Sequence, residues 1–133
     1  MAIVNRRSLP LAVHVASASP AEVKLIKPTI EDRFIAHYPP RLIGDRAYDS
    51  DPLDAELKKE FGIELIAPHR DNRVRPATQD GRALRRYKRR WVVERFFAWL
   101  HNFRRLVTRW ERHVENFVGM LQLGCMRILL NRL

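Results

Sequence analysis

The stretch RLIGDRAYDSDPLDAELKKEFGIELIAP, residues 41–68, carries the pattern that sets the fold class. Its first apolar residues predict a short strand that ends at Asp45. The segment DPLDAELKKEF then begins with Asp51 and Pro52, a pair that caps a helix, and Gly62 is expected to stop that helix. The following run, IELIAP, has the apolar character of a buried strand. Strand, helix and strand in succession indicate an α/β protein.

The flanking sequence extends this alternation of strands and helices. Residues 3–15 have the two-residue period of a half-buried strand in their second half and predict a hairpin. Residues 19–22, SPAE, have the form of a capping box, and the helix that follows should be kinked or split by Pro28. Two further helices are expected at about 83–109 and 113–131. The order β-β-α-β-α-β-α-α predicts an α/β fold with a mixed sheet flanked by helices.

Length and charge limit the classes of function. A chain of 133 residues is expected to form about one domain. Lys and Arg total 25 against 15 Asp and Glu, which gives a formal net charge of +10 and indicates a polyanionic partner. Residues 82–112 hold 11 of these basic residues and only two acids, Glu94 and Glu111. The charge therefore forms a stripe, although a merely soluble basic surface is the alternative reading of the pI.

Cysteine content and hydropathy bear on the cellular compartment. The lone Cys125 excludes a disulfide within the chain, which fits a reducing, cytoplasmic setting. The last apolar stretch, FVGMLQLGCMRILL, is interrupted by Gln122 and Arg127 and is too short to span a bilayer. We therefore expect no membrane association and interpret residues 114–131 as a C-terminal packing helix.

One acid, Glu94, stands inside the basic stretch RRYKRRWVVERFFAWLHNFRR, residues 85–105. At about 100° per residue, Glu94 shares one narrow helix face with four residues, and the apolar side chains lie opposite. The four are Tyr87, Arg90, His101 and Arg105, and the apolar set is Val92, Val93, Phe96, Trp99, Leu100, Phe103 and Val107. On geometry alone, a solvated face on which Glu94 pairs with Arg90 is the preferred explanation.

Two ordered motifs carry a resemblance to a known family. The spacing Tyr87-x2-Arg90-x3-Glu94, preceded by GDRAYDS, closely resembles the DDE transposases of bacterial insertion sequences, and the likeness covers nearly the whole chain. The resemblance implies an RNase H-like fold and DNA transposition by metal-dependent cleavage and transfer of DNA strands. It implies Asp45 and Glu94 as catalytic residues and metal ligands, with Mg²⁺ as the cofactor and Mn²⁺ as a possible replacement. Taken alone, Asp45 could equally be a turn residue after Gly44.

The same resemblance suggests which side chains meet DNA. The family signature usually ends with a lysine where this sequence has His101, and Arg104 and Arg105 are near enough to replace its phosphate contact. With Tyr87 and Arg90, these residues are the candidate DNA contacts. Tyr87 could also simply pack, and burial is the commoner fate for Trp91 than stacking on a base.

Other acids and the longest polar segment have weaker interpretations. Asp49 and Asp51 are expected to be turn and cap residues rather than metal ligands. The polar segment HRDNRVRPATQDGR, residues 69–82, is long enough for a loop to suggest a role of its own.

The sequence departs from the family at the first catalytic Asp. Residues 1–30 contain no Asp; Glu22 is their only acid, and Asp32, the earliest Asp, falls on a helix. Residues 1–133 therefore resemble the C-terminal portion of an incomplete catalytic domain that lacks its first strand, which would lie in the middle of the sheet. We expect the chain alone to be inactive. An upstream polypeptide could supply the missing Asp, and the complete protein is expected to form a homo-oligomer on transposon ends and target DNA.

Two other classes of function are kept open. A DNA-binding remnant or regulator would bind DNA without cutting it. An unrelated basic protein, such as a structural RNA-binding component, would prefer structured RNA and would ignore carboxylate substitutions.

Overall fold

The structure is a computed structural model that describes residues 1–79 and 81–132. Helices and short strands alternate along the chain, which confirms the mixed α/β class. The elements are β1 (Ala2–Val4), β2 (Pro10–Val13), α1 (Glu22–Glu31), β3 (Arg41–Ile43), η1 (Arg46–Tyr48), α2 (Asp51–Phe61), β4 (Glu64–Ile66), α3 (Gly81–Leu84), η2 (Arg85–Arg89), α4 (Trp91–Leu100), α5 (Arg104–Val107) and α6 (Val114–Leu130).

Strands β1 and β2 form the expected antiparallel hairpin, joined by a tight turn. The side chain of Asn5 accepts hydrogen bonds from the amides of Arg7 and Leu9, at 2.8 and 3.0 Å. Ser8 adopts a φ of 64°, and its buried hydroxyl accepts a hydrogen bond from Arg95 Nε at 2.8 Å. The side chain of Asn5 and a residue of α4 thus stabilise this turn.

The hairpin is covered on both faces, so the expectation of a half-buried strand is wrong. Helix α1 contacts one face, and Ala12 forms an isolated antiparallel bridge to Arg33 along the outer edge of β2. On the other face, Val13 packs in a cluster with Phe96 of α4 and Ile128 of α6. Helices on both sides bury neighbouring β2 residues that alternation alone would have assigned to opposite environments.

The β3-α2-β4 unit forms as expected from local sequence. Strand β3 pairs in parallel with β4, with Leu42 opposite Leu65. Gly62 ends α2 in the left-handed conformation, at φ 67°. The helix starts one residue earlier than expected, because Ser50 is the N-cap and its hydroxyl accepts from the Leu53 amide at 3.5 Å. Asp51 is instead the first helical residue.

The expected single mixed sheet is absent from the described residues. The strands form two separate sheets of two strands each, β1-β2 and β3-β4, which share no ladder hydrogen bond. Two apolar clusters correspond to this division. One joins α1, α2, β3 and β4, and the other joins β2, α4 and α6.

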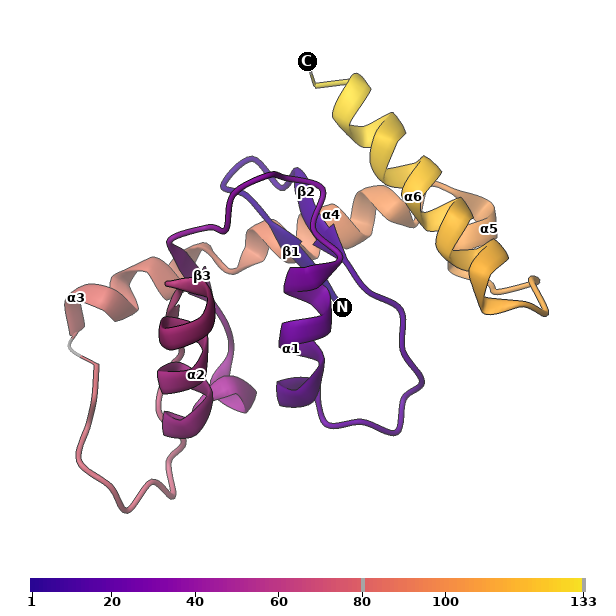
Figure 1. The fold of residues 1–133 in the computed structure, drawn as a ribbon. Coiled ribbons are helices and arrows are strands. Elements are labelled where there is room, and N and C mark those ends of the chain that lie inside the picture. The colour runs from indigo at the N-terminus through magenta and orange to yellow at the C-terminus, as the bar shows by residue number, and fades with distance from the viewer. Residues whose placement is uncertain (80, 133) are drawn as a thin grey trace.

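The expected helix over residues 83–109 is also wrong, because the structure divides it. Helix α3 passes through the 3₁₀ segment η2 into α4, which ends at Leu100. Phe103 then has an extended backbone and separates α4 from α5. The break lets Phe103 and Leu106 pack against α6, which lies across this end of the molecule (Figure 1). Gly124 permits the close approach, since a Cβ there would lie 3.0 Å from Leu106.

The remaining helix predictions have mixed outcomes. Helix α6 covers most of residues 114–131, and its side chains Cys125 and Ile128 are buried. The prediction of a capping box is wrong, because α1 has Ala21 as its N-cap and no side-chain hydrogen bond caps it. Pro28 lies inside α1 without splitting it. None of the helices in the described part of the chain is long and apolar enough to cross a membrane.

Candidate active site

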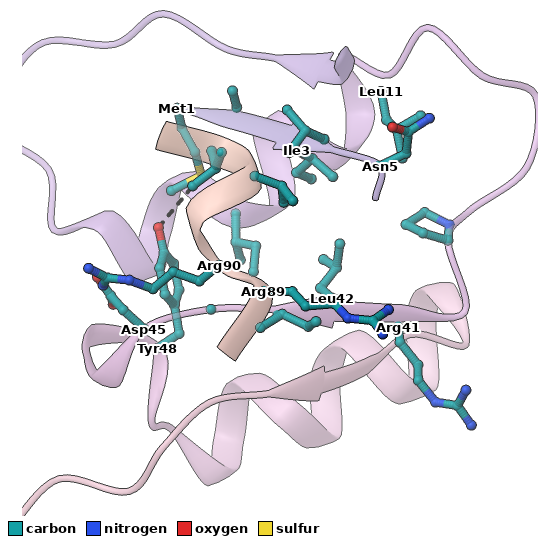
Figure 2. Close-up of a pocket in the computed structure, with 18 of the residues that line it drawn as sticks. Met1, Ile3, Asn5, Leu11, Arg41, Leu42, Asp45, Tyr48, Arg89 and Arg90 are labelled. Atoms are coloured by element: carbon teal, nitrogen blue, oxygen red, sulfur yellow. Dashed lines mark hydrogen bonds between the residues drawn. The ribbon is translucent and has the colours of Figure 1, made fainter. Parts of the chain in front are cut away.

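A cavity of about 690 Å³ lies where the hairpin, the end of β3 and the start of α4 meet. Asp45 and Glu94, 49 positions apart in the sequence, both line it. The arginines Arg86, Arg89 and Arg90 line the same cavity. Figure 2 shows Arg90 extending from the helix toward Asp45 and Tyr48. The two acids implied by the family motifs therefore share one cationic cavity.

Asp45 is held by the turn that follows β3. It is the N-cap of η1, and its Oδ1 accepts a hydrogen bond from the Ala47 amide at 2.8 Å. Its carbonyl accepts from the Tyr48 amide at 3.1 Å. The turn role is therefore real, but it uses one carboxylate oxygen. No side chain of the described residues hydrogen-bonds Oδ2, which remains able to bind a ligand.

Glu94 lies in the first turn of α4 and is largely exposed. Arg90 Nη2 forms an ion pair with Glu94 Oε1 at 3.2 Å, and Arg90 Nη1 donates to the Tyr87 hydroxyl at 3.5 Å. The structure thus brings Tyr87, Arg90 and Glu94 together. Because 61% of the Glu94 side chain is exposed, water screens this pair and its contribution to stability is small. Glu94 can exchange Arg90 for another cation at little cost.

Tyr48 forms the floor of the cavity beside Asp45. Its ring packs on Gly44, and its hydroxyl donates to Met1 Sδ at 3.9 Å (Figure 2). Burial raises the pKa of Tyr48, and the negative charges of Glu22 and Asp45 act in the same direction. Tyr48 therefore stays a neutral hydrogen-bond donor.

The acids present do not make a complete metal site. Glu22, at the start of α1, is a third acid on the cavity wall that the motif analysis passed over. Nevertheless, no three acidic, histidine or cysteine side chains among residues 1–79 and 81–132 are grouped so that they could hold a metal ion. Asp45 and Glu94 supply oxygen donors of the type that Mg²⁺ prefers, but too few to enclose it.

The other three candidate DNA contacts lie outside this cavity. His101 is the C-cap of α4, about 10 Å along the helix axis from Glu94. Arg104 and Arg105 belong to the separate helix α5, and Arg105 pairs with Glu111 at 3.8 Å. The expectation that Arg105 shares a helix face with Tyr87 and Glu94 is wrong, because the helix does not continue that far. The opposite apolar stripe ends early too, with Val107 exposed.

Comparison with known proteins now gives the family. The family described as "Transposase DDE domain" matches residues 1–129. The chain belongs to this family. The chain is 35% identical over 139 residues to "Putative transposase for insertion sequence element IS402" of Burkholderia cepacia. This match covers 98% of the chain and 62% of that protein.

A second relative matches a shorter part of the chain. "Putative transposase for insertion sequence element IS6501" of Brucella ovis is 33% identical over 89 residues, which cover 67% of this chain and 66% of that protein. The DDE domain chain thus spans less than two thirds of the length of either relative. No solved structure matches it.

The sequence motifs did not indicate two of the arginines that line the cavity of this DDE domain. Arg86 and Arg89 line the cavity beside Arg90, whereas the motif drew attention only to Arg90. Their three-residue spacing within the basic stripe is the signal that could have found them. Trp91, beside them in sequence, is 50% exposed and has the Arg95 guanidinium 4.7 Å from its ring centre. The expected burial of Trp91 is therefore wrong, and stacking on a base stays an untested alternative.

A second cluster of charges lies behind the Asp45 turn. The Asp49 carboxylate accepts hydrogen bonds from the Arg70 amide at 2.8 Å, His69 Nδ1 at 2.8 Å and Arg73 Nη1 at 2.9 Å. Burial alone would raise the pKa of Asp49, but these hydrogen bonds and the nearby positive charges hold it below its usual value. Arg73 also donates to Asp51 at 2.7 Å. Asp49 and Asp51 thus have structural partners, as expected of residues that are not ligands.

Proposed function

We propose that this chain is the C-terminal part of an RNase H-like transposase catalytic domain that cleaves and joins DNA once a third carboxylate is supplied. The observation that carries the proposal is the shared cavity of Asp45 and Glu94, which come from different elements. On this proposal, the isolated chain is inactive because it has two carboxylates where a metal site needs more.

The unpaired edges of the two sheets support the proposal that a strand is missing between them. Gly44 N–H donates to Ile66 O, so β3 directs the backbone groups of Gly44 toward β4 and those of Ile43 away from it. On the hairpin side, Met1 and His14 exchange both backbone hydrogen bonds, so Ala2 directs its groups away from β2. Both outward edges border the cavity, and no described residue pairs with them.

We infer that an extended segment lies between these edges in the complete domain. The cavity wall is apolar where β1 and β3 line it, with Ile3, Val4, Leu42 and Ile43. A strand there would satisfy the free backbone groups of both edges and join the two sheets into one. We infer that such a strand comes from an upstream polypeptide and carries an acid close to Asp45.

The metal and the DNA then have assigned partners. Members of this family generally use a divalent metal ion, and we infer Mg²⁺, with Mn²⁺ as a substitute. The bound ion would polarise the scissile phosphate and the attacking oxygen. In this chain, Asp45 and Glu94 would supply carboxylate oxygens and Arg90 would move from Glu94 to a DNA phosphate. Tyr87 would direct its hydroxyl to the strand.

A second group of basic side chains, His101, Arg104 and Arg105, lies at and just beyond the C-terminal end of α4. We infer that His101, Arg104 and Arg105 bind phosphates beyond the cleavage point, because they lie at the far end of α4. Two copies of the completed protein would be needed to hold two transposon ends and the target DNA.

A complementation assay tests this proposal. The part of the Burkholderia relative that lies outside the match is coexpressed with this chain, and Mg²⁺-dependent nicking of supercoiled plasmid is measured. We expect no nicking by the chain alone and nicking by the pair, abolished by Glu94→Gln. Glu115→Gln, on the exposed first turn of α6, is the matched control and should leave nicking intact. Nicking by the isolated chain that Glu94→Gln abolishes would contradict the proposed incompleteness.

A non-catalytic DNA-binding remnant or regulator is the second candidate function. The observation that favours it is the absence of a three-acid group from the described residues, combined with the Arg90 to Glu94 ion pair. Such a protein would bind DNA with strong salt dependence, and neither Mg²⁺ nor Asp45→Asn would change the affinity. Failure of the coexpressed pair to nick, with binding of this kind, would establish it.

A further inference from the structure

The polar loop between β4 and α3 makes contacts that the proposed catalytic role does not explain. Its residues His69, Arg70 and Arg73 all reach the short η1 turn or its ends. We propose that Arg70 and Asp49 are positioning residues that hold this turn and thereby aim the Asp45 carboxylate into the cavity. The inference rests on the proposed role of Asp45 and adds the device that orients it.

Arg70 binds the turn at three points. Its Nε donates to Arg46 O at 3.1 Å and its Nη2 donates to Ala47 O at 2.8 Å. Its backbone amide donates to Asp49 Oδ2 at 2.8 Å. A planar guanidinium presents several donors in fixed directions, so it can fix the relative position of two neighbouring carbonyls.

Ala47 connects the hydrogen bonds of Arg70 to the proposed catalytic acid, Asp45. Its amide donates to Asp45 Oδ1 at 2.8 Å, while its carbonyl accepts from Arg70. Displacement of the turn therefore moves the donor that orients Asp45. A carboxylate that must bind a metal from a fixed direction requires such support.

Asp49 anchors the other end of the turn. It is the C-cap of η1, and its side chain is 7% exposed, as is fitting for a carboxylate with three donors. Arg73, which pairs with it, has a side chain that is 11% exposed. Removal of either charge would deprive the other, which is largely buried, of one of its partners.

The loop itself is fixed at both ends, which makes it a rigid support. His69 Nε2 accepts a hydrogen bond from the Thr78 amide at 3.2 Å. The Gln79 side chain accepts from the Ala67 amide at 3.2 Å and donates to Leu65 O at 3.1 Å. The loop is thus tied back to the end of β4 before α3 begins.

Amide hydrogen exchange on the full chain tests the proposal. In Arg70→Met, exchange at Ala47 should become roughly tenfold faster, while the Leu57 amide in the core keeps its protection. The matched control is Arg75→Met on the same loop, whose side chain is 73% exposed and pairs only with Asp51 among the described residues. It should leave Ala47 unchanged.

Two results would overturn the proposal. Either Ala47 keeps its protection in Arg70→Met, or Ala47 and Leu57 lose protection together, which indicates general destabilisation. If Arg70→Met does not fold, Arg70→Lys takes its place, since an ammonium group cannot bind both carbonyls in the same geometry. Asp49→Asn should produce a change in the same direction as Arg70→Met.

Mn²⁺ titration separates this inference from the proposed function. In the complex with the coexpressed part of the Burkholderia relative, Mn²⁺ should broaden the NMR resonances of Asp45 and Glu94, and several-fold more Mn²⁺ should be needed at Asp45 when the chain carries Arg70→Met. Equal Mn²⁺ dependence in the two proteins would refute the positioning role. If Mn²⁺ broadens neither residue in that complex, the proposed metal site is wrong, and hydrogen exchange at Ala47 in the isolated chain still decides whether Arg70 orients the turn.

Discussion

Gly44→Ala should destabilise the protein by crowding the residue that precedes Asp45. A Cβ at this position would lie 2.8 Å from Tyr48 Cδ2, 3.0 Å from Cγ and 3.1 Å from Cβ. The backbone cannot easily withdraw, because the Gly44 amide donates to Ile66 O at 3.0 Å. The Tyr48 ring is half-buried and reaches Met1, so its movement disturbs the cavity floor as well.

The expected magnitude combines two opposing effects. Overpacking of this kind costs about 1–3 kcal/mol. Replacement of glycine by alanine also restricts the unfolded chain, which offsets roughly 0.4–1 kcal/mol. We expect the free energy of unfolding to fall by about 1–2 kcal/mol, measured by urea denaturation followed by far-UV circular dichroism. Gly119→Ala in α6 is the control: nothing lies within 4 Å of its Cβ, so it should stabilise by about 0.5–1 kcal/mol.

A second background makes the explanation refutable. When Tyr48→Ala has removed the ring, Gly44→Ala should lose most of its destabilising effect, because the two changes share one contact. If Gly44→Ala costs the same free energy with and without the Tyr48 ring, or costs nothing in the unaltered chain, the close approach is not the cause.

Three further predictions concern ionisation, the hairpin turn and DNA. Burial and nearby carboxylates raise the pKa of Asp54 to about 6, so the folded chain holds this proton more tightly than the unfolded chain and loses stability as the pH rises from about 4 to above 6. Asp54→Asn should therefore raise the free energy of unfolding by about 1 kcal/mol at pH 8 and leave it unchanged at pH 4; an equal gain at both values in urea titrations contradicts this. Arg95→Met leaves the buried Ser8 hydroxyl without its donor and should cost about 1–2 kcal/mol by thermal denaturation; an unchanged midpoint would show that this bond is unimportant. Replacing Arg86 and Arg89 together with alanine should reduce the slope of log affinity for DNA against log salt concentration by about two, measured by fluorescence anisotropy; an unchanged slope would place the DNA elsewhere.

Local signals explain the parts of the fold that the sequence predicted well. The β3-α2-β4 unit depends on short apolar runs and on Gly62, whose left-handed conformation ends the helix without reference to distant residues. The error at its start was a single residue, because Ser50 and Asp51 are both good caps and sequence alone does not rank them.

The break after α4 could not be predicted in this way. Helical periodicity continues through Phe103 and Leu106, but packing against Gly124 of α6 outweighs it, and that contact joins residues about 20 positions apart. The same error transferred Arg105 to the wrong helix face. Burial of the second face of the hairpin likewise depends on α4 and α6, which lie far away in sequence.

The candidate site was predicted in part. The motifs indicated Asp45 and Glu94, and both line one cavity. The contacts of Asp49 with His69, Arg70 and Arg73 join residues 20 or more positions apart through an irregular loop. No periodicity marks such a loop, so its length was the only signal that it had a role.

The two open strand edges also affect how the isolated chain behaves at high concentration. An unpaired edge is a template for any extended segment, including the edge of a second copy of the same chain. Here each edge is only three residues long, and the formal net charge of +10 makes two copies of the chain repel each other. Charge repulsion between copies weakens as salt is added. Purification at low ionic strength should therefore keep the chain monomeric, whereas high salt should favour aggregates with β structure.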